Sequence, residues 1–368
     1  MKKVFTLVAI GALAATSLDA AAQFTVDGTA STTEIGTGIG KYQLAASYTN
    51  THSEADRGLK ALYIGYTATT LNILVAGSAE SASGSYRALV LYLNTPGRTG
   101  APAGVQLAGG GDGQSPLKHK PTMDMQVDYG FRTSVGPTTA LATDVYFSRV
   151  SYVTGGTPVV TPGNDTYLGA GSKAGAAFTA PATLDLAGSK FSYLNTATLT
   201  ANTTNSGFEI EIPLATLGGA VTVGSRLDMF AAFTDGDGIF TTDIIPQVPG
   251  RTAVFGADPN FTTVAGGQSL AYVIGTGVLS NQTAAPELGF QVYPNPTQAA
   301  ATVAYKVPGG QQDVTLAVYN SMGQLVRSLV NEQQTGSQEY RLNNLAAGAY
   351  LVKLQVGARL TSRKIIVE

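Results

Sequence analysis

Leu59 to Gly77 read LKALYIGYTATTLNILVAG, in which two apolar runs are joined by the short turn Ala68-Thr69-Thr70. Leucine, isoleucine, valine and tyrosine dominate both runs, and these residue types favour β-strands. A third run, Ala88 to Leu93 (ALVLYL), is apolar at every position. Continuous runs of this kind are typical of strands buried on both faces or in a sandwich core. These stretches predict a β-protein.

Outward from this region, short strand-like segments recur along the chain. Phe208 to Ile212 alternates strictly, and Pro213 is expected to end that strand because proline cannot donate to a ladder. The Gly/Ala/Pro-rich residues 100–120 and 154–190 are predicted to be long loops. Further strands are predicted over Asp124–Tyr129, Ala142–Ser148, Phe191–Leu194, Leu227–Phe233 and Ser269–Ile274. Many short strands separated by turns predict an all-β fold, with a large N-terminal β-sandwich and a small C-terminal one.

The composition excludes several classes of function. Charged residues are 12% of the 368 and the net charge is −2, so the chain lacks the basic patch that nucleic acid requires. Cysteine is absent, which excludes disulfides, thiolate catalysis and Cys-based zinc sites. The two histidines, His52 and His119, are too few for a His-rich metal centre.

Residues 1–22 have the pattern of a secretory signal peptide. Lys2 and Lys3 precede an apolar stretch, Val4 to Ala15, and Ala20-Ala21-Ala22 supplies the small residues of a cleavage site before Gln23. The apolar stretch is too short to span about 30 Å of hydrocarbon. We therefore expect an exported protein without a transmembrane segment in its mature chain.

The pattern changes near residues 281–288, which we interpret as a linker between a β-sandwich over 23–280 and a second domain over 289–368. Beyond the linker, turns are predicted at Pro308-Gly309-Gly310, at Asn320-Ser321-Met322-Gly323 and at Ala347-Gly348. Six or seven short strands are expected between and around them.

The C-terminal residues carry several blocks in a fixed order: FQVYPNP (290–296), VTLAVYNSMGQLV (314–326), LAAGAYLVKL (345–354) and RKIIV (363–367). Together they resemble the type A C-terminal sorting domain of the type IX secretion system of Bacteroidetes. The resemblance implies an immunoglobulin-like sandwich and passage through the periplasm and outer membrane by the type IX machinery. It also implies removal of the domain or attachment to the cell surface. The motif residues are Tyr293, Pro294, Asn295, Pro296, Gly348, Tyr350, Lys353 and Lys364.

The residues of this domain also predict local structure. Pro294 and Pro296 each fix φ and are expected to form a stiff lead into its first strand. In the last hairpin, Leu351, Lys353 and Gln355 should lie on one face, opposite Val352, Leu354 and Val356. The alternative is a C-terminal β-module that mediates adhesion.

The N-terminal part contains FTVDG (24–28) and GFEIEIPLATLG (207–218) on either side of the strand series. This order resembles the family 9 carbohydrate-binding module and its DOMON-like relatives over residues 24–275. The resemblance implies a sugar-binding β-sandwich with structural calcium. Characterised members clamp the sugar between tryptophans, whereas this chain has none. Stacking on sugar would have to come from its 17 tyrosines or 13 phenylalanines.

A calcium site is one interpretation of TDGDG (234–238). Asp235 and Asp237 lie two residues apart across a glycine, Asp228 lies upstream and Asp243 downstream, and carboxylate oxygens suit Ca²⁺. We take Asp235, Asp237 and Asp243 as the candidate ligands. The alternative is an Asp-Gly turn between two strands.

No catalytic constellation emerges, and we expect that the protein is not an enzyme. Glu209 and Glu211 share one strand face, about 7 Å apart by strand rise, which a glycosidase could use; we favour the alternative, a solvated strand face. His52 and His119 are expected in exposed loops. Four tyrosines on predicted strands are interpreted as core more than as a binding platform: Tyr63, Tyr66, Tyr92 and Tyr129.

Three functions remain open at this point. The first is a non-catalytic surface or secreted module that binds carbohydrate. The second is a structural or adhesive surface protein without a small ligand. The third, which the missing catalytic motifs favour least, is an enzyme acting on glycosides.

Overall fold

In the computed structural model the described residues are 24–55, 57–82, 84–154, 157–158, 165–182, 186–195, 205–218, 221–222, 224–264, 266–275, 277–279, 288–320, 325–356 and 359–368. The predicted signal peptide, most of the predicted linker and the turn residues after Asn320 lie outside them. The fold is all-β, as predicted, and the described residues contain no α-helix. They contain three 3₁₀ turns: η1 (Pro116–Lys118), η2 (Leu214–Thr216) and η3 (Phe261–Thr263).

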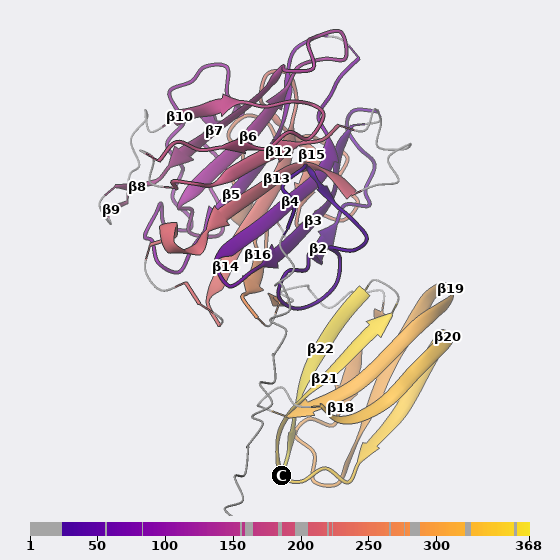
Figure 1. The fold of residues 1–368 in the computed structure, drawn as a ribbon. Helices are drawn as coiled ribbons and strands as arrows, with labels where there is room; N and C mark the ends of the chain where they lie inside the picture. The colour runs from indigo at the N-terminus through magenta and orange to yellow at the C-terminus, as the bar shows by residue number, and fades with distance from the viewer. Residues whose placement is uncertain are drawn as a thin grey trace, which may run out of the picture.

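The N-terminal part consists of two antiparallel sheets (Figure 1). The first sheet has the order β11 (Phe178–Thr179), β12 (Lys190–Tyr193), β13 (Asn205–Pro213), β4 (Thr70–Ser78), β3 (Gly58–Tyr66), β2 (Gln43–Ser47), and β1 (Thr29–Ala30) also pairs with β13. The second sheet has the order β10 (Asp165–Ala170), β7 (Val145–Ser151), β6 (Tyr129–Val135), β5 (Arg87–Asn94), β14 (Arg226–Thr234), β16 (Leu270–Val273), β17 (Gly277–Leu279), and β15 (Phe240–Ile245) also pairs with β14. A small ladder joins β8 (Val153–Thr154) and β9 (Thr157–Pro158).

The main core lies between the two sheets and contains a cluster of phenylalanines. The ring of Phe147 on β7 lies 5.8 Å from the rings of both Phe191 on β12 and Phe208 on β13, measured between centroids. These aromatic contacts join strands of opposite sheets, which is the sandwich geometry that the sequence predicted.

Both sheets also bury part of their outer faces. Residues 99–127 and 240–264 contribute an apolar layer over the second sheet, in which Tyr92 and Phe230 pack against Leu117 and Phe261. Phe24 and Tyr42 lie over the first sheet against Tyr63 and Leu74. Strands buried on two faces need apolar residues at every position, which explains the continuous runs in β4 and β5.

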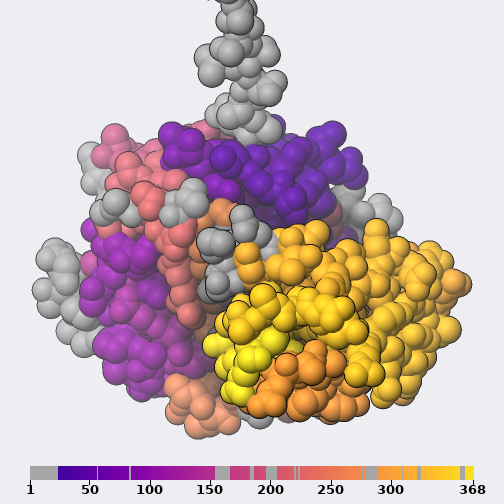
Figure 2. Space-filling model, turned by 90° about the horizontal axis from the view of Figure 1, so that it is seen from below, coloured from indigo at the N-terminus to yellow at the C-terminus, as the bar shows by residue number. Residues whose placement is uncertain are grey.

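The C-terminal part is one barrel-like sheet of five strands, which forms a single mass in the orange-to-yellow colours of Figure 2. The strands are β18 (Gln291–Tyr293), β19 (Ala300–Asn320), β20 (Leu325–Asn343), β21 (Gly348–Val356) and β22 (Arg359–Val367). The two long strands β19 and β20 pair along most of their length, and a parallel bridge between Thr297 and Val367 links the segment after β18 to β22. Its core is apolar and separate from the cores of the N-terminal sheets.

Several strand and loop predictions were wrong. The strand expected at Asp124–Tyr129 is a loop up to β6, because its alternating residues Met123, Met125 and Val127 pack on the outer face of the second sheet with only isolated bridges. The loop expected over 154–190 contains β10, β11 and the start of β12.

In the C-terminal sheet, the turn expected at Pro308-Gly309-Gly310 is an irregularity within β19, where the register with β20 shifts between Val307 and Gln312. The chain does not reverse there, so five strands replace the six or seven that were expected. Within the described part of the chain, no helix combines the length and the apolar character needed to cross a bilayer.

Candidate functional site

Three neighbouring tyrosines form the candidate site, which we call the tyrosine row: Tyr86, Tyr146 and Tyr167. The centroids of the Tyr86 and Tyr146 rings lie 5.9 Å apart, and those of Tyr146 and Tyr167 lie 6.5 Å apart. Tyr167 is 59% exposed and Tyr86 is 39% exposed, while Tyr146 between them is half-buried. Exposed aromatic rings placed side by side are unusual on a protein surface and are typical of binding sites.

Strand alternation places these rings on the outer face of the second sheet. On β7, Val145 and Phe147 point into the main core, so Tyr146 points outward. Tyr167 on β10 is in register with Ser148 of β7, and the strands β10, β7 and β6 lie side by side (Figure 1). Among the described residues, the apolar layer over this sheet contains none of the three tyrosines.

The polar groups beside the row are tied to partners. The Tyr146 hydroxyl donates to Asp144 Oδ1 at 3.2 Å. Arg132 on β6 donates to Asp112 Oδ2 at 3.2 Å and to the carbonyl of Tyr146. Burial, followed by the nearby Asp144 carboxylate, raises the pKa of both Tyr86 and Tyr146. The row is therefore a set of neutral rings next to a carboxylate.

Glu209 does not lie on a solvated face, so that interpretation was wrong. The residue is fully buried beneath the N-terminal strap, which we define as residues 24–42. Its Oε2 accepts hydrogen bonds from the backbone N–H groups of Asp27 (2.9 Å) and Gly28 (2.7 Å), and its Oε1 accepts one from the Tyr42 hydroxyl (2.7 Å). Glu209 thus joins the VDG and GFE segments of the sequence and fastens the strap to β13.

Glu211, two residues along β13, is also buried. It pairs with Lys190 at 2.8 Å and accepts a hydrogen bond from Asn72 at 3.2 Å. Glu209 and Glu211 both have hydrogen-bond or ion-pair partners within the protein. These two carboxylates therefore do not face each other across a cleft that a substrate could enter.

The burial of Glu209 predicts a pH dependence of stability. Burial raises its pKa to about 8, from 4.5 in an exposed chain. Between these two values the unfolded chain ionises while the folded one keeps its proton. The contribution of Glu209 to the free energy of unfolding should therefore be largest below about pH 4.5 and fall towards pH 8, by up to about 1.4 kcal/mol per pH unit. Urea denaturation across this range measures the slope, and Glu209→Gln should remove it. A slope that is the same in both proteins would contradict this assignment.

His52 and His119 lie in loops, as predicted, but they are partly buried rather than exposed. The Nδ1 atom of His52 lies 2.5 Å from Oδ2 of the fully buried Asp243, and the side chain is 28% exposed. The same Asp243 oxygen accepts the backbone N–H of Leu59. The Nε2 atom of His119 lies 3.2 Å from the carbonyl oxygen of Asp237, and its side chain is 15% exposed.

The candidate calcium ligands have partners within the protein. Asp235 Oδ1 accepts the backbone N–H groups of Asp237 and Ile239, both at 2.9 Å, as in an Asp-Gly turn. Asp243 contacts His52 as described above. Among the described residues, no group of three or more His, Cys, Asp or Glu side chains could hold a metal ion. The calcium site stays a prediction.

The four tyrosines singled out from the sequence are core residues, as predicted. Tyr92 and Tyr129 are fully buried, and Tyr63 and Tyr66 are each 7% exposed. The tyrosines of the row were missed. One signal in the sequence indicated that Tyr146 faces outward: it lies between two apolar residues, Val145 and Phe147, on a predicted strand.

Two parts of the sorting motif, at Asn295 and at Lys364, meet in the C-terminal sheet. The YPNP segment follows the first strand β18, so the expectation that it leads into that strand was wrong. Asn295 bridges to β22: its Nδ2 donates to the carbonyl of Lys364 at 2.7 Å, and its Oδ1 accepts the backbone N–H of Ile366 at 2.9 Å. The motif residues near 295 and those near 364 thus hold the last strand in place.

The final hairpin follows the predicted alternation. Val352, Leu354 and Val356 are buried, whereas Leu351, Lys353 and Gln355 are exposed. Gly348 opens β21, and the Tyr350 hydroxyl donates to the carbonyl of Ala346 at 2.9 Å.

Residues 291–368 match the family model described as "Secretion system C-terminal sorting domain". These residues are a type IX sorting domain. A sorting domain of this kind marks a protein for export, so the chain is secreted or displayed on the cell surface.

Other comparisons add little to this. No curated protein matches the chain. Among solved structures, the chain is similar to the one described as dimeric latent PorU from Porphyromonas gingivalis, with 12% sequence identity and a TM-score of 0.19. The match covers 81% of this chain and 31% of that one. We base no inference about fold or function on a similarity this low.

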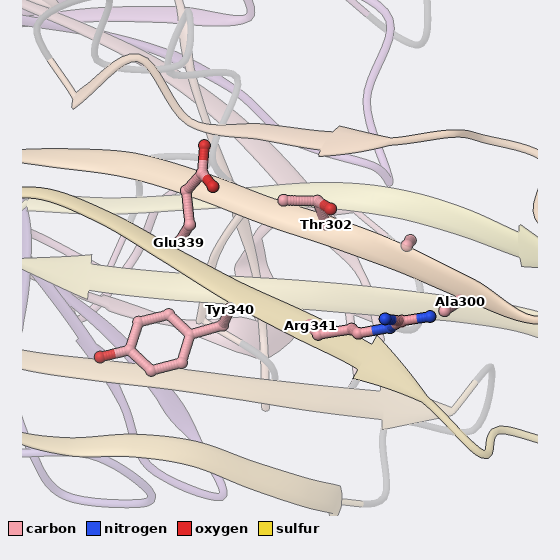
Figure 3. A pocket seen from close by; sticks show the side chains of 6 residues that line it. Ala300, Thr302, Glu339, Tyr340 and Arg341 are labelled. Atoms are coloured by element: carbon pink, nitrogen blue, oxygen red, sulfur yellow. The ribbon is translucent and has the colours of Figure 1, made fainter.

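A shallow hollow of about 350 Å³ lies on the sorting domain, between β19 and β20 (Figure 3). Thr302 of β19 is in register with Arg341 of β20, and Glu339 lies on the same face of β20. Tyr340 extends from the opposite face of that strand (Figure 3). The hollow is open and polar, and its position on the sorting domain separates it from the tyrosine row.

The bridge made by Asn295 predicts an effect on both stability and export. Asn295→Ala removes two hydrogen bonds that hold β22, so the sorting domain should lose about 1–3 kcal/mol of stability. We expect less protein at the cell surface, measured by fractionation of a host with a type IX system. Gln298→Ala is the matched control, since Gln298 is exposed on the same segment. Equal export of both variants would contradict the role given to Asn295.

Proposed function

We propose that the protein is a non-catalytic carbohydrate-binding protein whose N-terminal sandwich holds glycan on the tyrosine row. The row itself carries the proposal, because three neighbouring rings lie on or next to strands of one sheet and two of them are well exposed. A tyrosine ring offers a large apolar surface together with a polar hydroxyl. Sugar rings present the complementary pattern, with apolar C–H faces and hydroxyls at their edges.

The acidic residues support a non-catalytic role. A glycosidase needs two carboxyl groups that face the scissile bond from either side. Glu209 and Glu211 are instead buried, and their partners are the strap and neighbouring strands. Their role is structural, in line with a sandwich that presents a binding surface.

The route and partners belong to the same proposal. The type IX secretion machinery would recognise the sorting domain after the signal peptide has directed the chain to the periplasm. The sorting domain would then be removed, or the protein attached to the surface. A structural Ca²⁺ near Asp235 and Asp237 would stabilise a domain that has no disulfides.

Calorimetric titration of a glycan panel into residues 23–368, with the sorting domain retained, tests the proposed function. We expect heat with at least one glycan, and loss of that heat in Tyr167→Ala. Tyr293→Ala is the control, because Tyr293 is similarly exposed (45%) but belongs to the sorting domain. No heat from any glycan, with an intact fold, would contradict glycan binding. That outcome would favour the structural or adhesive surface protein.

A further inference from the structure

The rings of the tyrosine row are not coplanar. The planes of Tyr86 and Tyr146 are inclined by 42°, and those of Tyr146 and Tyr167 by 48°. A flat crystalline surface can stack on several rings at once only if the rings share a plane. A single polysaccharide chain can instead rotate about each glycosidic bond and present one sugar face to each ring. The inclination of the rings therefore favours a single twisted chain.

The charges around the row favour a neutral chain. Tyr86 and Tyr146 both lie in the field of Asp144, whose carboxylate would repel a uronate or a sulfate. The nearby Arg132 is paired with Asp112, and Arg87, next to Tyr86, is paired with Glu54 at 3.1 Å. Both guanidinium groups already have carboxylate partners, so neither serves as an open anion site.

We propose that the tyrosine row binds a single, neutral, twisted polysaccharide chain and neither a crystalline polysaccharide surface nor an anionic glycan. This inference rests on the proposed function and specifies its ligand. The chain would cross from β10 over β7 to the segment before β5, with one contact on each ring.

Two kinds of binding experiment test the inference on the mature full chain. The first titrates soluble neutral glucan and mannan oligosaccharides of increasing length. Affinity should rise until the chain spans all three rings and then stay constant. Tyr86→Ala, Tyr146→Ala and Tyr167→Ala should each weaken binding about tenfold, as expected for loss of one aromatic partner. Tyr293→Ala should bind like the original protein.

The second experiment measures depletion of the protein by crystalline cellulose and chitin, and titration with polyuronate. We expect no depletion, and binding of polyuronate that is much weaker than binding of the neutral oligosaccharides. Asp144→Asn should raise the affinity for polyuronate a few-fold, because it removes the repelling charge. Thermal melting of each variant confirms that the exposed substitutions leave the fold intact.

The outcomes separate the inference from the proposed function. Depletion by a crystalline polysaccharide that depends on the three tyrosines would overturn the inference and leave glycan binding in place. Binding of soluble glycans that is unchanged in all three variants would also overturn it, because the site would lie elsewhere. Absence of binding to every carbohydrate would overturn both.

Discussion

Glu209→Ala is expected to destabilise the N-terminal domain by about 3–5 kcal/mol, because each buried donor left without an acceptor costs about 1–3 kcal/mol. Three donors converge on this carboxyl: the N–H groups of Asp27 and Gly28 and the hydroxyl of Tyr42. The loss should appear as a lower urea midpoint for the unfolding of the N-terminal domain.

Two further variants sharpen this experiment. In Glu209→Gln, the amide oxygen can still accept both backbone N–H groups and the amide nitrogen can donate to the Tyr42 oxygen, so most of the stability should remain. Glu211→Ala should cost less than Glu209→Ala, because the Lys190 side chain is 37% exposed and can return to water. If Glu209→Ala were as stable as Glu211→Ala, the role of Glu209 as the fastening of the strap would be wrong.

Phe147→Ala is expected to cost about 3–5 kcal/mol, the range for removing a buried phenylalanine. Phe147 is fully buried, and its ring contacts the rings of Phe178, Phe191 and Phe208. These neighbours belong to strands of the opposite sheet, which cannot close around the cavity without a shift of the whole sheet. Urea denaturation measures the loss.

The neighbour of Phe147 provides a matched control for this substitution. Tyr146 lies on the same strand but faces outward, so Tyr146→Ala should change stability by at most about 1 kcal/mol. Phe147→Ala should also weaken glycan binding, because Phe147 anchors the segment of β7 that carries Tyr146. Similar stability losses in both variants would contradict the assignment of the two faces of β7.

The strands of the sandwich could be predicted where burial of one or both strand faces leaves a pattern of apolar residues in the sequence. The runs in β3, β4 and β5 are apolar because both of their faces are covered, and strict alternation marked β13. The same reasoning failed at residues 124–128. Alternation there reflects packing of a loop on a sheet. A pattern of apolar and polar residues along the sequence does not distinguish such a loop from a strand.

The candidate site could not be predicted, because it depends on contacts distant in sequence. Tyr86, Tyr146 and Tyr167 meet only through the register of β5, β6, β7 and β10. Glu209 and Glu211 have the alternation of a solvated face, yet the strap that covers Glu209 lies 181 residues away at Gly28. The sorting domain was predictable because its motifs are contiguous stretches of sequence that stand in a fixed order along the chain.

The distance between the strap and Glu209 has a consequence for the order of folding. Asp27 and Gly28 can complete their contacts with Glu209 only after residue 209 has been made, and we expect β13 to pair with β4 before they do. Closing so long a loop is entropically costly, and domains dominated by such pairings fold slowly, in about milliseconds to seconds. We expect the amide protons of Asp27 and Gly28 to gain protection in the last phase of refolding in pulse-labelled hydrogen exchange, and earlier protection would contradict this order. A domain whose first residues lock last remains incomplete until the chain through residue 209 is present.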